Sequence, residues 1–108
     1  MSGSFEDRRK GFESKWAHDE EMRFKIMSRR NKLLGLWAAG ELGLSGDKAD
    51  AYASSVVAAE FNKPGDEGVF QKVRADLDKT KYSDHMIRHQ LLELLEDASQ
   101  QVQKDTKK

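Results

Sequence analysis

Hydrophobic side chains recur at helical spacing in four stretches of the chain, and no stretch shows the alternation typical of a β-strand. The predicted helices span about residues 17–42, 45–62, 66–79 and 83–103. Turn-forming residues separate them, most clearly the run NKPGD at residues 62–66. Four helices with short connections predict an all-α fold, a small four-helix bundle over residues 17–103 followed by a polar tail at 104–108.

The same periodicity predicts which side chains form the interior of this bundle. Expected inward positions are Phe24, Met27, Leu34, Trp37, Ala38, Ala49, Tyr52, Ala53, Val56, Val57, Phe61, Val69, Phe70, Val73, Leu77, Ile87, Leu91, Leu94, Leu95, Ala98 and Val102. Ser45 or Asp47, and then Ser83, are the expected N-caps. Gly35 and Gly40 lack the lysine and hydroxyl spacing of a phosphate loop, so they predict close helix packing.

The first sixteen residues form a separate pattern. Phe5, Phe12 and Trp16 fall on one helical stripe, which ends at charged residues 19–21. Gly11 weakens this segment by roughly 0.5–1 kcal/mol relative to alanine, and so short a helix is marginal alone. We expect a mobile, weakly helical N-terminal arm over residues 1–16, helical when bound. Either a partner covers its aromatic stripe or the stripe folds back onto the bundle.

The amino-acid composition limits the classes of function that the chain can have. The chain has 108 residues, is 37% hydrophobic and 35% charged, and has zero formal net charge, which argues against a nucleic-acid binder. The charge is uneven: residues 1–32 carry nine basic and six acidic side chains, and residues 33–80 carry five and eight. The molecule is therefore expected to be dipolar, basic at the front.

Cysteine is absent and no signal peptide is visible. The longest apolar run, residues 33–40, is far shorter than the roughly 20 residues that span a bilayer. We expect a cytoplasmic protein without direct membrane insertion.

Candidate chemistry is sparse. His85, His89 and Glu93 are four residues apart on one helix, and such a set spans about 12 Å of rise, too far to share one metal ion. We expect an ordinary histidine pair, with pH sensing as the alternative. His18, beside three acids, is expected to be structural. No nucleophile, base and acid set is present, so neither an enzyme nor a cofactor is predicted.

Arg29, Arg30 and Lys32 form a basic cluster before the apolar run. It predicts either a site for phosphate, of a nucleotide or of nucleic acid, or a solvated helix face that pairs with acids four residues away. A nucleotide at this site would make the protein a nucleotide-sensing bundle.

Several runs resemble one known family: FEDR at residues 5–8, FESKWAHDEE at 12–21, RRNKLLGLWAA at 29–39, GDE at 65–67 and KVRADL at 72–77. They are similar to the ATPase inhibitor subunit zeta of alphaproteobacterial ATP synthases. The resemblance covers almost the whole chain and is most specific over residues 17–39. It implies a four-helix bundle with an N-terminal arm that inserts into the F1 sector.

The resemblance also implies a mechanism. The arm becomes helical at a catalytic alpha–beta interface, reaches toward the gamma subunit and blocks hydrolytic rotation, while the bundle stays outside. The protein would then be peripheral to the inner membrane through the ATP synthase. On this basis the partner-binding residues are Phe5, Phe12 and Trp16 as anchors, with Arg8, Arg9, Lys10 and Lys15 at the rim. The alternative is a nucleotide-sensing or other regulatory helical binding module.

Overall fold

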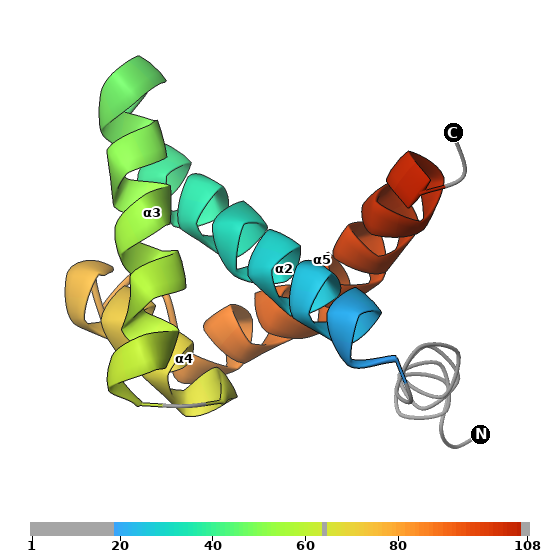
Figure 1. Cartoon of the computed structure of the whole chain (residues 1–108). Coiled ribbons are helices and arrows are strands. Elements are labelled where there is room, and N and C mark those ends of the chain that lie inside the picture. Colours follow the sequence, from blue (N-terminus) through green and yellow to red (C-terminus); the bar gives the residue numbers. More distant parts are fainter. Residues whose placement is uncertain (1–18, 64, 107–108) are drawn as a thin grey trace.

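The computed structural model describes residues 19–63 and 65–106 and folds them into four helices (Figure 1). They are α2 (Glu20–Glu41), α3 (Gly46–Asn62), α4 (Asp66–Asp76) and α5 (Asp84–Thr106). No β-strand occurs in this part of the chain, so the predicted all-α class is confirmed. The predicted arm over residues 1–16 lies outside the described residues.

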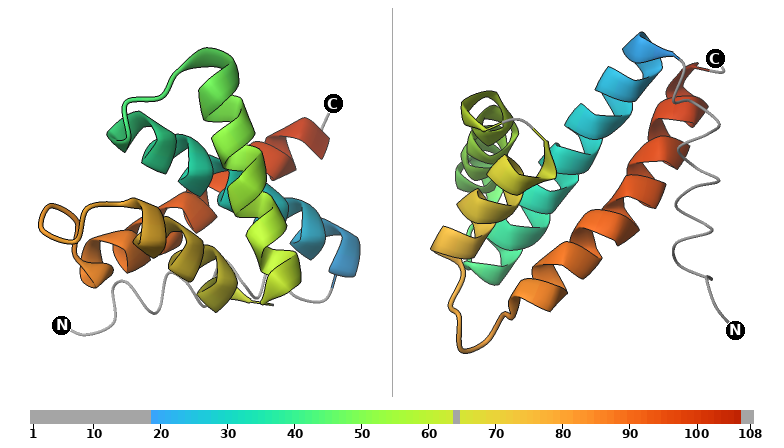
Figure 2. Two further views of the ribbon diagram at one scale, coloured as in Figure 1. Left: turned by 90° about the vertical axis from the view of Figure 1, so that its left-hand side faces the viewer. Right: turned by 90° about the horizontal axis from the view of Figure 1, so that it is seen from below.

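Helix α2 is the centre of the bundle, because the two most extensive helix pairs are those that it forms with α3 and with α5. Helix α5 lies along one side of it and runs in the opposite direction, whereas α3 crosses its other side (Figure 2). Arg29, in the first half of α2, pairs with Asp105 near the end of α5, which fixes the antiparallel direction. Helix α4 packs against α3 and α5 and closes the bundle.

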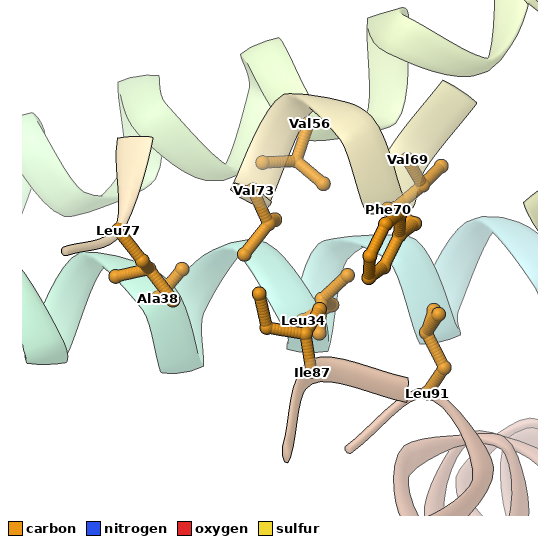
Figure 3. Packing of buried hydrophobic residues seen from close by; sticks show 9 residues of the cluster. All are labelled: Leu34, Ala38, Val56, Val69, Phe70, Val73, Leu77, Ile87 and Leu91. Atoms are coloured by element: carbon orange, nitrogen blue, oxygen red, sulfur yellow. The ribbon is translucent and has the colours of Figure 1, made fainter. Parts of the chain in front are cut away.

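Among the described residues, the larger of two hydrophobic clusters joins all four helices (Figure 3). Its buried members are Leu34, Ala38, Val56, Val69, Phe70, Val73, Leu77, Ile87 and Leu91. A second cluster packs Ile26 of α2 against Leu95, Ala98 and Val102 of α5. Since burying a Leu, Ile, Val or Phe side chain stabilises by about 1.5–3 kcal/mol each, these clusters hold the helices together. The positions expected to face inward on α4 and most of those on α5 are confirmed.

Local residues define the helix ends. Asp19 is the N-cap of α2, and its carboxylate accepts a hydrogen bond from the Met22 N–H at 3.0 Å. At the other end, Gly43 has a φ of +81°, and the N–H of Leu44 bonds to the carbonyl of Ala39 at 2.8 Å. This pattern is a Schellman motif, in which glycine tolerates the left-handed conformation. The predicted cap Ser83 is confirmed, because its hydroxyl accepts from the Met86 N–H.

At Gly35, α2 approaches α3 closely. A Cβ added to Gly35 would lie 2.6 Å from the Cα of Ala53, closer than real Cβ atoms come. Close packing was predicted for both Gly35 and Gly40, and it holds for Gly35. It is wrong for Gly40, where an added Cβ meets nothing within 4 Å.

Two aromatic residues were wrongly predicted to face the core. Phe24 is 66% exposed and Phe61 is 80% exposed. Phe24 is two residues from the buried Ile26, which places the two side chains about 200° apart around α2. Phe61 belongs to the last turn of α3, which ends at Asn62, and its side chain faces solvent. Periodicity alone did not separate these positions from the true core face.

Helix α5 continues through the first residues of the predicted polar tail and ends at Thr106. One contact with α2 lies in this extension: the Arg29 guanidinium donates to Asp105 at 3.1 Å. Just before it, Arg29 also donates to Gln101 at 2.9 Å, and Val102 is buried in one cluster with Ile26. The last helical turns therefore belong to the bundle.

Candidate functional site

The described bundle begins at Asp19, directly after the segment that holds the predicted partner-binding residues. Asp19 has extended backbone angles (φ −103°, ψ 103°), and α2 starts only at Glu20. A capped helix start means that any helix formed upstream is a separate element from α2. The predicted partner-binding residues all precede Asp19 and lie outside the described residues: Phe5, Arg8, Arg9, Lys10, Phe12, Lys15 and Trp16.

The structure brings two of the three predicted phosphate ligands together: Arg29 and Lys32 line a hollow of about 390 Å³ with Lys25, whereas Arg30 does not line it. Arg30 is only 2% exposed and pairs with Asp66 of α4 at 2.9 Å. Arg29 is held by α5, as described above, and Lys32 is exposed to solvent. The three cations therefore do not all share one site, because Arg30 is not among the residues that line the hollow of Arg29 and Lys32. The arginines do not pair with acids four residues away. Of the three, the buried Arg30 is the least accessible to a phosphate.

Arg30 instead belongs to a polar network that sequence reasoning missed. Its Nε and Nη2 donate to the Asn31 side-chain oxygen at 3.0 and 2.9 Å, and Nη2 also donates to Asp66. The Asn31 amide in turn donates to Glu60 of α3 at 2.8 Å. This chain of bonds ties α2 to α3 and α4. A buried arginine needs such partners because an unpaired buried charge is costly.

A hollow of about 640 Å³ opens between the start of α2 and the end of α3. The lining consists of Glu20, Arg23, Phe24, Met27, Ser28, Val57, Glu60, Phe61 and Gly65. The two wrongly placed aromatic residues therefore share one surface feature. We call it the α2–α3 hollow. Glu20, which lies directly after the cap Asp19, is part of its wall.

Other polar contacts join helices. The Tyr52 hydroxyl donates to Asp76 at 2.8 Å, and burial together with this bond raises the pKa of Tyr52. A hydrogen bond to Glu41 raises the pKa of Tyr82, whose ring also meets Trp37 edge-on at 6.2 Å. Both tyrosines therefore stay protonated at neutral pH. Each hydroxyl can donate its hydrogen bond, which ties together two parts of the fold that are distant in sequence.

His85 and His89 line a separate, smaller hollow of about 320 Å³ with Trp37. Within residues 19–63 and 65–106, no group of three or more His, Cys, Asp or Glu side chains is arranged to hold a metal ion. None of the helices described here combines the length and apolar character that crossing a membrane requires. His18 lies outside the described residues.

The described residues define a small all-helical bundle whose polar groups serve to join one part of the fold to another. Comparison with protein-family models shows which family of proteins this chain belongs to. The model of the ATPase inhibitor subunit zeta family matches residues 1–101, and the chain belongs to this family. A search of curated proteins finds no match to the chain.

Family membership implies a regulatory, non-catalytic role as an inhibitor that interacts with ATP synthase. The match includes both the N-terminal segment and nearly all of the described bundle. It confirms the family on which the expected inhibitor role rests.

Proposed function

We propose that the chain inhibits ATP hydrolysis by inserting residues 1–16, as a helix, at a catalytic alpha–beta interface of the F1 sector. The inserted helix reaches toward the gamma subunit and hinders its rotation. The observation that carries this proposal is the family match over residues 1–101, which includes the aromatic stripe Phe5, Phe12 and Trp16.

The described bundle supports two separate roles, one for residues 1–16 as the inhibitory segment and one for the helices that stay outside the enzyme. Asp19 caps α2, and the described residues form two hydrophobic clusters among themselves. An upstream segment is therefore free to fold on a partner without breaking a continuous helix. Coupled folding and binding of this kind costs several kcal/mol and keeps the complex reversible.

The anchors in this proposal are Phe5, Phe12 and Trp16, since aromatic side chains dominate interface energetics. Arg8, Arg9, Lys10 and Lys15 contact acidic or carbonyl groups at the rim. The protein acts in the cytoplasm, at the inner membrane only through ATP synthase, and needs neither a cofactor nor nucleic acid.

The test is inhibition of hydrolysis by the full chain with Phe12→Ala or Trp16→Ala. Loss of a hot-spot aromatic is expected to weaken inhibition at least about tenfold. The melting temperature should stay unchanged, because the described core is left intact. A large fall in melting temperature would instead show that the stripe packs on the bundle as a fifth element.

A further inference from the structure

We propose that the α2–α3 hollow is a second docking site for ATP synthase, which takes an apolar side chain of the enzyme flanked by a basic residue. Exposed aromatic residues carry the inference. Within the described residues, the exposed large hydrophobic side chains are Phe24, Leu42, Phe61 and Met86. Both aromatic members of this set, which are also its two most exposed, meet at one hollow. Clustered exposed aromatics are typical of interaction surfaces.

The position of the hollow points to the partner. Glu20 lines it, and Glu20 is separated from the proposed inhibitory segment only by residues 17–19. A segment bound in a groove of the enzyme therefore brings this end of the bundle to the enzyme surface. The hollow lies beside the entry point of the segment, so one interface continues into the other.

The size of the hollow argues against a second copy of the chain as occupant. Nine residues line it, whereas a stable interface uses about 20–30 residues on each side. A site this small is too limited to hold a dimer by itself. As an extension of an interface anchored by Phe5, Phe12 and Trp16, it is large enough to contribute.

The charges around the hollow indicate what it accepts. Glu20 and Glu60 contribute two carboxylates and Arg23 contributes one guanidinium, so the wall has an excess of negative charge. Glu60 already accepts a hydrogen bond from Asn31, which holds it in place. A basic residue next to an apolar side chain complements this wall, because opposite charges at a rim improve association.

The test uses the full chain with Phe24→Ser or Phe61→Ser, and Met86→Ser as a matched control. Met86 is an exposed hydrophobic residue on α5, away from the hollow. Affinity for purified F1 sector, inhibition of hydrolysis and melting temperature are measured for each. We expect the phenylalanine variants to bind F1 about fivefold to thirtyfold more weakly than wild type. Their melting temperatures should equal that of wild type, and Met86→Ser should bind F1 as wild type does.

A second pair of variants tests the charge. Glu20→Gln and Asp47→Asn each remove one exposed carboxylate from the first turn of a helix, but only Glu20 lines the hollow. The first variant is expected to weaken F1 binding a few-fold and to lower its dependence on salt. The second is expected to leave both unchanged. Equal effects of the two variants would overturn the assignment of the acidic wall.

Three results would overturn the proposal. If Phe24→Ser and Phe61→Ser bind F1 as tightly as Met86→Ser does, the hollow makes no contact with the enzyme. Stronger inhibition by these variants shows that the hollow holds the chain's own residues 1–18. If the wild-type chain forms a concentration-dependent dimer in sedimentation and Phe24→Ser abolishes it, the hollow binds a second copy of the chain.

The proposal rests on the function proposed above, and the two fail in different ways. Wild type that binds F1 without slowing hydrolysis contradicts the inhibitory mechanism, while weaker binding of Phe24→Ser still supports the hollow. If the wild-type chain inhibits hydrolysis and neither Phe24→Ser nor Phe61→Ser changes that inhibition, only the proposed docking site at the hollow is contradicted.

Discussion

Arg30 of α2 and Asp66 of α4 form an ion pair at 2.9 Å in which the arginine side chain is buried and the aspartate is 42% exposed. The two residues are 36 positions apart in the chain. Asp66 is the first residue of α4, so the pair fixes the start of that helix against the centre of the bundle. The basic cluster of residues 29–32 is thus partly a structural device.

Asp66→Ala is expected to destabilise the bundle by about 1–3 kcal/mol, because it leaves the buried Arg30 charge without its carboxylate. The loss is smaller than for a fully buried pair, since water reaches Asp66. Unfolding in urea, followed by circular dichroism, measures the change. The control is Asp105→Ala, which removes an exposed Arg–Asp pair and should cost less than about 1 kcal/mol. Equal losses in the two variants would contradict the role given to Arg30.

Substitutions at Gly35 and Gly40 are expected to change stability in opposite directions. Gly35→Ala forces a Cβ against Ala53 and should cost about 1–2 kcal/mol net, after the gain in helix propensity. Gly40→Ala adds a methyl group to open space and should stabilise α2 by roughly 0.5 kcal/mol. Melting temperatures compare the two variants directly. A stabilising Gly35→Ala would mean that α2 and α3 do not pack closely at this point.

Gly11→Ala tests whether residues 1–16 act as a helix on the enzyme. Alanine removes a helix penalty of roughly 0.5–1 kcal/mol, so inhibition should become about twofold to fivefold tighter. Titration of ATP hydrolysis with wild type and variant measures this change. Gly11→Pro is the opposing control and should weaken inhibition strongly, because proline disrupts a helix interior. Inhibition that is equal in all three chains would rule out a helical inhibitory segment.

Much of the fold is predictable from the sequence because it follows from local patterns. The break at residues 62–66 and the cap at Ser83 use turn and capping chemistry that acts within a few residues. Buried positions such as Ile87 and Leu91 follow a clean 3.6-residue period on a helix with one apolar face. Such features need no knowledge of the partner helix.

Other features depend on where the neighbouring helices end. Phe24 and Phe61 fit the apolar period, but neither is covered by a neighbouring helix in the described bundle. The burial of Arg30 depends on Asp66, a residue whose proximity only the tertiary fold creates. The candidate site on the bundle was therefore missed by periodicity, which treats every apolar residue on a helix face as core.

The central claim is tested most directly by removing residues 2–16 and measuring ATP hydrolysis by the cognate F1 sector. The described residues 19–106, apart from residue 64, hold both hydrophobic clusters, so the shortened chain should keep its helical circular dichroism signal and its melting temperature. The account predicts that this folded bundle no longer slows hydrolysis, whereas the full chain does. Full inhibition by the shortened chain would contradict it.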